Sequence, residues 1–247
     1  MDLTLLGRAL TAEGRVRRAD RAKRAIDLLA GTVLLLAAVP LIVALALGSA
    51  IALRAWPFFV QERIGRDGRS FRFLKIRTLP PATCAYADKY ALAQVPIPAF
   101  SRALRAVHLD ELPQLLLVVL GRMSLVGPRP EMPALHAQLP PQLARARELV
   151  RPGCTGLWQV GERCDRLIGE SPEYDLFYVQ HRNLRLDLWI LGQTVRKVVR
   201  GGRGLVALDQ VPGWATAASA PAQAPVEDDA VIDLRDHFAP HLVSLEA

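Results

Sequence analysis

The sequence is poor in the residues that build disulfide frames, zinc sites or nucleic-acid surfaces. Its three cysteines, Cys84, Cys154 and Cys164, are scattered and form no CxxC pair, so we expect reduced cytosolic thiols rather than a disulfide scaffold. Aromatic residues make up 6% of the chain and do not alternate with Lys and Arg. The net charge of +7 would suit a polynucleotide, but without such motifs we expect no nucleic-acid partner.

Acidic residues are scarce over most of the chain and collect at its end. Positions 209–247 hold seven acidic residues and one basic residue, so residues 1–208 carry an excess of positive charge. A basic body of this kind suits anionic lipid headgroups and phosphorylated substrates. Residues 208–247, rich in Ala and Pro before the acidic run, are predicted to form a flexible acidic tail without chemistry of its own.

Charge is absent altogether from residues 28–53, a run of 26 residues. As a helix this run would reach about 39 Å, more than a hydrocarbon core of about 30 Å requires. Pro40 lies at its middle, where proline kinks a helix. The flanks, residues 1–24 and 54–77, hold seven Lys and Arg each, whereas a crossing segment should have one poorer flank.

We therefore expect a basic segment over 1–24, followed over 25–54 by a helix, a break at Pro40 and a second helix. This re-entrant hairpin would enter and leave one leaflet of the membrane. A kinked helix that spans the bilayer is the main alternative, because spanning helices tolerate proline. A cleaved signal peptide is a weaker one, because its apolar core would be about half as long.

The remaining residues predict a mainly α cytosolic domain over 55–207 with a small β-hairpin. Two branched and aromatic runs, Phe58–Ile64 and Ser70–Thr78, flank a glycine-rich turn and form the hairpin. Helical spacing predicts a helix through Leu112–Val119, a charged helix ending near residue 150, and a weak helix near 86–94. Residues 184–203 form a basic amphipathic helix that packs on the core or lies in the membrane interface.

One acidic pair precedes a helix that proline can begin. Asp110 and Glu111 stand just before Pro113, which favours the first turn of a helix. Alone, such a pair is most often a helix cap. A carboxylate that attacks a pyrophosphate also needs cations, namely Mg²⁺ on the phosphates and basic side chains around the transferring group. Candidate side chains are Lys75, Arg77, Arg105 and Arg129.

Five motifs in fixed order give these candidates a family context. They are Lys75-Ile76-Arg77-Thr78, Leu109-Asp110-Glu111-Leu112-Pro113-Gln114-Leu115, Ser124-Leu125-Val126-Gly127-Pro128-Arg129-Pro130, Arg151-Pro152-Gly153-Cys154-Thr155-Gly156-Leu157-Trp158-Gln159-Val160 and Tyr174-Asp175-Leu176-Phe177-Tyr178-Val179. From about Lys23 to Arg200 the chain resembles the bacterial sugar transferase family, the monotopic phosphoglycosyl transferases, in its short form.

The resemblance implies transfer of a hexose-1-phosphate from a UDP-sugar to polyprenyl (undecaprenyl) phosphate, which initiates cell-surface glycoconjugate synthesis such as that of exopolysaccharide. Asp110 would attack the β-phosphate, release UMP and hold the sugar phosphate, while Asp110 and Glu111 would bind Mg²⁺. The resemblance also implies a re-entrant segment in the inner membrane, among membrane lipids, with the catalytic domain facing the cytoplasm. Substrate binding would fall to Arg105, Lys75, Arg77, Pro128, Arg129, Pro130, Gln159 and Asp175.

The chain also departs from the family's pattern. Val39 precedes Pro40 where a serine is common, His108 stands where serine or lysine is usual, and the loop after Thr78 has prolines instead of an acidic run. An inactive membrane scaffold of the same fold is therefore the competing interpretation. The presence of Asp110, Glu111 and Arg105 together argues against it.

Overall fold

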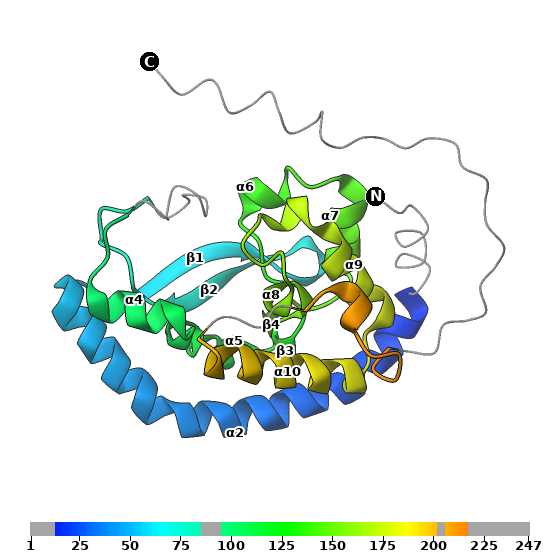
Figure 1. Cartoon of the computed structure of the whole chain (residues 1–247), viewed down its shortest axis with the longest axis horizontal. Coiled ribbons are helices and arrows are strands. Elements are labelled where there is room, and N and C mark those ends of the chain that lie inside the picture. The colour runs from blue at the N-terminus through cyan, green and yellow to red at the C-terminus, as the bar shows by residue number, and fades with distance from the viewer. Residues whose placement is uncertain (1–12, 85–94, 202–205, 217–247) are drawn as a thin grey trace, which may run out of the picture.

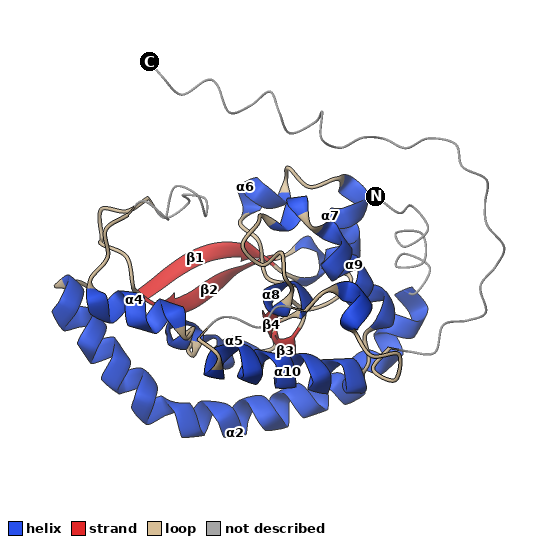
Figure 2. Ribbon diagram, viewed as in Figure 1, coloured by secondary structure: helices blue, strands red, loops and turns tan. Residues whose placement is uncertain are grey.

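The computed structural model describes residues 13–84, 95–201 and 206–216 of the chain (Figure 1). These residues are mainly helical with two small sheets (Figure 2), which confirms the predicted mainly α class with a hairpin. The weak helix predicted near 86–94 lies outside the described residues. So do residues 217–247, most of the predicted tail.

The longest element is α2 (Glu13–Leu53), which stays helical through Pro40. The predicted break in the helix at Pro40 is therefore wrong for this structure. Proline removes one hydrogen bond of the helical ladder, and the bonds on either side keep the helix continuous. Figure 1 shows α2 bent along its length, with the rest of the described chain on its concave side. Arg21–Leu53 is long and apolar enough to cross a membrane by length and composition.

The N-terminal part of α2 is tied to the body by polar contacts. The Arg24 guanidinium donates to the backbone carbonyls of Val118 and Val119 at 2.6 and 3.0 Å. The Lys23 ammonium donates to the Asp187 carboxylate at 2.7 Å. These contacts satisfy carbonyls at the end of a short helix and hold α2 against two different elements.

The C-terminal part of α2 touches the same body. Gly48 lies so close to the Phe100 ring that a Cβ there would come within 2.5 Å of Cζ, and the Ser49 hydroxyl donates to the Arg77 carbonyl. Between the two contacts the helix exposes a set of large apolar side chains, namely Leu28, Leu29, Val33, Leu34, Leu36, Val39, Leu41, Val43 and Leu47. The buried residues of this part of α2, namely Asp27, Gly31, Ala46 and Ser49, lie toward its two ends, and no residue from 32 to 45 is buried.

The predicted hairpin is confirmed. β1 (Phe58–Ile64) pairs antiparallel with β2 (Ser70–Ile76) around a 3₁₀ turn at Arg66–Gly68. Phe71 and Phe73 are buried while Arg72 is exposed, so one face of β2 meets the core as the alternation predicts. The second strand ends at Ile76, two residues earlier than expected.

A second sheet was not predicted. β3 (Ser124–Val126) pairs parallel with β4 (Gly153–Thr155). A Cβ on Gly153 would lie 2.1 Å from the Gly127 nitrogen. The segments 127–130 and 151–153 therefore pack backbone to backbone. Three-residue strands are too short to show the alternation that identifies a strand.

Short helices and turns complete the body. They are α4 (Ala99–Ala106), a 3₁₀ turn at Leu109–Glu111, α5 (Gln114–Val119), α6 (Pro133–His136), α7 (Pro141–Glu148), α8 (Leu157–Val160), a 3₁₀ turn at Ile168–Glu170, α9 (Pro172–His181), α10 (Leu184–Val199) and a 3₁₀ turn at Leu208–Gln210. The charged helix predicted to end near residue 150 is two helices, α6 and α7, because Pro140 and Pro141 interrupt it.

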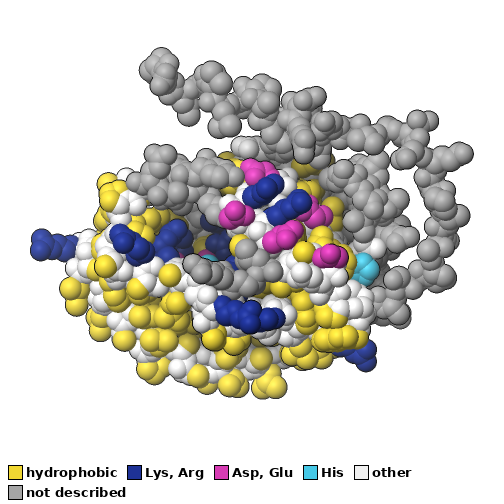
Figure 3. Space-filling view, viewed as in Figure 1, with side chains coloured by type: hydrophobic (Ala, Val, Ile, Leu, Met, Phe, Trp, Pro, Cys, Tyr) yellow, Lys and Arg dark blue, Asp and Glu magenta, His cyan; other side chains and the backbone are white. Residues whose placement is uncertain are grey.

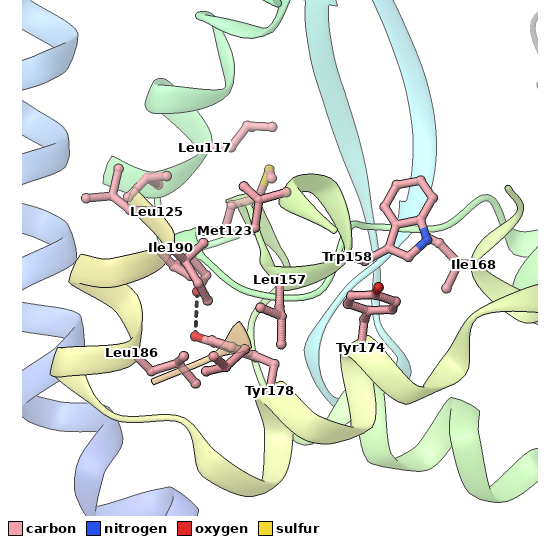
Figure 4. Close-up of a cluster of buried hydrophobic side chains, with 14 of the residues drawn as sticks. Leu117, Met123, Leu125, Leu157, Trp158, Ile168, Tyr174, Tyr178, Leu186 and Ile190 are labelled. Carbon is pink, nitrogen blue, oxygen red and sulfur yellow. Dashed lines mark hydrogen bonds between the residues drawn. The ribbon is translucent and has the colours of Figure 1, made fainter. Parts of the chain in front are cut away.

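The core lies between α5, the second sheet and α8 to α10 (Figure 4). Within it the Tyr178 hydroxyl reaches the Val126 carbonyl at 2.9 Å and Asp187 at 2.8 Å. Val211 and Ala215 are buried in the same core. Residues 208–216, assigned to the tail from composition, therefore pack against the body.

α10 confirms the predicted amphipathic helix, but its apolar stripe faces outward. Leu186 and Ile190 are fully buried, whereas Leu184, Leu188 and Val195 are exposed. The exposed side chains Leu184, Leu188 and Val195 are therefore separate from the core-facing Leu186 and Ile190. Such an exposed apolar stripe fits an interfacial helix better than one that packs only on a core.

Candidate functional site

A cavity of about 490 Å³ gathers six of the predicted site residues. They come from β2, the last turn of α4, the 3₁₀ turn before α5, the loop after β3, and α8, and are Lys75, Arg105, Asp110, Glu111, Arg129 and Gln159. Figure 3 shows basic side chains in and around a hollow on the visible face, with hydrophobic side chains along the lower margin. Residues up to 84 positions apart in the sequence therefore line the same cavity.

The local backbone explains why Asp110 points inward. His108 adopts a left-handed conformation (φ 58°) and begins the turn Leu109–Glu111, after which Pro113 leads into α5. This reversal leaves Asp110 only 4% exposed although it stands in a polar loop. A non-glycine residue held at positive φ costs free energy, and such strain is typical of functional sites.

Glu111 is clamped by Arg129. The two Arg129 terminal nitrogens lie 2.9 and 3.4 Å from the two carboxylate oxygens, a bidentate pair of the strong kind. Burial alone would raise the pKa of Glu111, but the charge and hydrogen bonds of Arg129 outweigh it and bring that pKa to about 2. Glu111 is therefore ionised and fixed in place across the physiological range.

Asp110 is in a different state from its neighbour. Burial and the adjacent Glu111 charge raise the pKa of Asp110 to about 6, against the opposing pull of Lys75, Arg105 and Arg129. Burial in turn lowers the pKa of Lys75 to about 8, although Asp110 and Glu111 oppose the shift. Near pH 7 the site therefore holds an ionised but poorly solvated carboxylate facing cations, the state required of a nucleophile.

Asp175 lies outside the cavity. It is 1% exposed and pairs with Arg147 at 3.2 Å, and the Arg147 guanidinium donates to the backbone carbonyl of Arg129. The prediction that Asp175 binds substrate is not supported by this placement, because a second buried charge neutralises it. Asp175 instead holds Arg147, which in turn binds the backbone of Arg129, the residue that pairs with Glu111.

Three further predicted residues do not line this cavity. Arg77 donates to the carbonyls of Trp56 and Phe58 and lies over the Phe59 ring at 5.7 Å. Pro128 and Pro130 line a smaller pocket on the other side of Arg129. Arg77 lines another small pocket together with Lys75. Contact of these three residues with substrate stays a prediction.

The cavity also contains residues that the sequence did not single out for it. These are Arg63, His108, Glu131, Arg166, Thr194 and Lys197. Thr194 and Lys197 belong to α10, where the sequence shows only a basic amphipathic pattern. No motif distinguishes a lysine that reaches a cavity from one that faces solvent, so the folded chain was needed to find them.

The donor set fits Mg²⁺ in a limited way. Among the described residues, no three His, Cys, Asp or Glu side chains are grouped to hold a metal by themselves. Magnesium in phosphate-transfer sites commonly uses one or two carboxylates and takes its other ligands from phosphates and water. Asp110 and Glu111 can supply those carboxylates, with Glu111 shared between metal and Arg129.

Comparisons with known proteins identify the family of this chain. The family model described as bacterial sugar transferase matches residues 18–201. The chain is 34% identical over 193 residues to the exopolysaccharide production protein ExoY of Rhizobium meliloti (strain 1021), which covers 72% of this chain and 85% of that protein. It is 36% identical over 191 residues to the UDP-glucose:undecaprenyl-phosphate glucose-1-phosphate transferase of Caulobacter vibrioides, with 71% and 69% covered.

A third relative is longer. The UDP-galactose-lipid carrier transferase of Erwinia amylovora is 35% identical over 162 residues, which are 58% of this chain and 33% of that protein. This chain thus spans about a third of the Erwinia protein's length. Since the family model covers residues 18–201, well over half of the sequence, the chain belongs to the bacterial sugar transferase family.

Proposed function

We propose that this protein transfers a hexose-1-phosphate from a UDP-sugar to undecaprenyl phosphate and so initiates synthesis of a cell-surface glycoconjugate. The observation that carries the proposal is Asp110, a buried carboxylate in a cavity with Lys75, Arg105 and Arg129. The name of the Caulobacter relative describes the same reaction with glucose. Both point to phosphoryl chemistry next to a lipid acceptor.

The first step is an attack by an Asp110 carboxylate oxygen on the β-phosphorus of the donor. The bond between this phosphorus and the bridging oxygen breaks, and UMP leaves with the electron pair. Asp110 then holds the sugar phosphate as an acyl phosphate, and no proton is required for charge balance. Repulsion between a carboxylate and a pyrophosphate opposes this step, and preorganised cations reduce it.

The residues around Asp110 have different roles in this step. Lys75 and Arg105 face the Asp110 carboxylate and can neutralise the transferring phosphate, while Arg129 is engaged by Glu111. Because its carboxylate is held at both oxygens, Glu111 is a poor nucleophile and a good positioning group. Bound Mg²⁺, held by Asp110 and Glu111, would supply further positive charge to the phosphates.

The membrane part of the proposal concerns the lipid substrate. An undecaprenyl chain stays in the bilayer, so the cavity must lie close to the membrane surface. We propose that α2 is re-entrant in the inner membrane and that the body faces the cytoplasm, where UDP-sugars are made. Support comes from the contacts of both ends of α2 with the same body and from the apolar side chains exposed between them.

The test of the nucleophile is Asp110→Asn. We expect UMP release to fall on the order of 10³-fold or more, since an amide is not an anionic nucleophile, while membrane association is kept. UMP is measured with purified protein in nanodiscs, Mg²⁺, undecaprenyl phosphate and a panel of UDP-sugars. Asp67→Asn is the matched control, because Asp67 is 59% exposed in the hairpin turn and asparagine tolerates its left-handed conformation.

Mass spectrometry of the wild-type protein mixed with donor alone should locate a phosphosugar on Asp110. Near wild-type UMP release by Asp110→Asn would exclude the covalent mechanism. If the wild-type protein inserts in membranes but releases UMP from none of the donors, the inactive scaffold becomes the better interpretation.

A further inference from the structure

We infer that the part of the cavity formed by α10 is the subsite for the phosphate of the lipid acceptor, with Lys197 as its main cation. This inference rests on the proposed function and adds to it the place where the second substrate binds. It follows from the two faces of α10, from the charge state of Lys197's surroundings and from its relation to the Asp110 segment.

α10 has one side on the cavity and another on the apolar surface. Thr194, Lys197 and Val198 line the cavity, whereas Val195 and Val199 are 63% and 80% exposed. Residues two apart on an α-helix point roughly 200° apart around its axis. Lys197 therefore faces inward between two valines that face outward in the same turn.

The outward side of α10 belongs to a larger apolar surface. Leu116 and Leu120 of the α5 region are exposed, as are the apolar side chains in the middle of α2. The N-terminal part of α10 touches α2 through the ion pair between Asp187 and Lys23, and Figure 3 shows hydrophobic side chains covering the margin below the hollow. Exposed apolar area of this extent marks a surface that contacts protein or membrane, and a family that uses a lipid acceptor favours the membrane.

A lipid phosphate that approaches from this surface meets α10 before it meets Asp110. The polyprenyl chain remains in the leaflet while its phosphate lies at the water boundary, so the phosphate must enter past an element that borders both. α10 is such an element. Lys75 and Arg105 come from β2 and α4 and act on the Asp110 carboxylate, so we assign them to the donor phosphates.

The hydrogen-bond partners of the Lys197 side chain are a backbone carbonyl and a thiol. Its ammonium donates to the Gln159 carbonyl at 2.6 Å and lies 3.3 Å from the Cys164 sulfur. Among the described residues no carboxylate forms an ion pair with it, whereas Arg129 pairs with Glu111 and Arg63 with Glu131. An ammonium fixed by neutral groups retains its full attraction for a phosphate.

Lys197 shares its cavity with the proposed nucleophile. Lys197 and Asp110 both line the cavity of about 490 Å³. A phosphate held by Lys197 would therefore lie in the same cavity as the phosphosugar on Asp110.

The second step then balances without an added reactant. An oxygen of the acceptor phosphate attacks the phosphorus of the aspartyl phosphosugar and forms the new P–O–P bond. The bond between that phosphorus and the Asp110 carboxylate oxygen breaks, and its electron pair returns to the carboxylate. The total charge is unchanged, so no proton needs to move.

The test is Lys197→Met, which removes the charge and keeps the length of the side chain. With saturating donor we expect the KM for undecaprenyl phosphate to rise about tenfold or more, as for loss of a charge-assisted hydrogen bond. The single-turnover release of UMP from donor alone should change less than twofold. Arg196→Met is the matched control: it removes one charge from an exposed position of the same turn and should alter neither quantity.

A second measurement does not depend on turnover. Native mass spectrometry of nanodisc-purified protein should show less bound undecaprenyl phosphate for Lys197→Met than for the wild type and Arg196→Met. An unchanged acceptor KM and unchanged lipid binding would overturn the inference. A comparable loss of UMP release from donor alone would also overturn it and assign Lys197 to the donor. Failure of the proposed function is a different result, since the wild-type protein would then release no UMP.

Discussion

Two adjacent carboxylates in this protein have pKa values that are shifted in opposite directions, because their partners differ. Arg129 binds both oxygens of Glu111 and brings its pKa to about 2. Asp110 is buried beside that negative charge, and its pKa rises to about 6. Environments that separate the pKa values of neighbouring acids are a known way to assign them different roles. Here one carboxylate is fixed and the other is available for attack.

The two shifted groups predict a bell-shaped pH profile for the first half-reaction. UMP release needs ionised Asp110, so its rate should fall as pH drops through about 6. It should fall again as pH rises through about 8, where Lys75 loses its charge. The profile is measured as kcat/KM for the donor, which reports the groups of the free enzyme.

One variant tests whether the alkaline limb of this pH profile belongs to Lys75. Lys75→Arg keeps its charge to a much higher pH and should shift or remove the alkaline limb while the acidic limb stays near its place. A rate that is flat between pH 5 and pH 7 would contradict the assignment of Asp110 as the ionising nucleophile.

Single residues also show how far the sequence could be interpreted. Motif order placed Lys75, Arg105, Asp110, Glu111 and Arg129 together, and one cavity contains them all. Arg77 and Asp175, which the same motifs suggested, lie outside this cavity and bind backbone carbonyls and a buried arginine. A charged residue in a motif looks the same whether its partner is a substrate or another part of the chain, because that partner comes from tertiary structure.

At the scale of elements, the joint between α2 and the body depends on a buried carboxylate. Asp27 is 4% exposed, and its two oxygens accept from the Ser124 hydroxyl at 2.7 Å and the Leu125 amide at 3.2 Å. The Lys23 ammonium nitrogen lies 3.8 Å from an Asp27 carboxylate oxygen, one turn earlier in α2. The membrane segment is therefore hydrogen-bonded directly to β3, the strand that leads to Arg129.

Replacing this carboxylate should loosen the joint. Asp27→Asn keeps the shape but turns one acceptor into a donor that faces a hydroxyl or an amide. We expect a loss of about 1–3 kcal/mol in the free energy of unfolding, the usual result of an unsatisfied buried group, and a lower Tm in nanodiscs. Asp67→Asn, in the exposed hairpin turn, should leave Tm unchanged, and equal Tm values for the two variants would show that Asp27 is not a structural anchor.

Elements were predictable where their pattern was long enough. The hairpin has seven-residue strands and a glycine-rich turn, and both were found from sequence. β3 and β4 have three residues each, and their pairing depends on glycines that let two distant loops touch. Pro40 was expected to break α2, but one missing hydrogen bond is too little to end a long apolar helix.

The described part of the molecule has an apolar surface and a charged cavity. Apolar side chains of α2, the α5 region and α10 are exposed, while the cavity of basic and acidic residues opens on a face bordered by them (Figure 3). In the proposed membrane setting, this arrangement would keep the charged site in water and its margin against lipid. A soluble donor and a membrane-bound acceptor would then reach Asp110 from different directions.

The contacts of α2 lead to a prediction about topology. About 26 helical residues separate Lys23 from Ser49, a length of roughly 39 Å if straight, and both ends touch the same body. A helix that crosses the bilayer would place these ends in different compartments, where one body could not contact both. We therefore expect residues on the two sides of the apolar segment to lie in the cytoplasm.

Substituted-cysteine labelling in intact cells measures this directly. In a background with Cys84, Cys154 and Cys164 changed to serine, single cysteines replace the exposed residues Arg21 and Arg69. A membrane-impermeant maleimide should label neither until the inner membrane is permeabilised, and then both. Labelling of Arg21→Cys alone from outside would mean that α2 spans the membrane. The contacts of Lys23 and Arg24 with the body would then be incompatible with the native state, because a bilayer would separate them from α5 and α10.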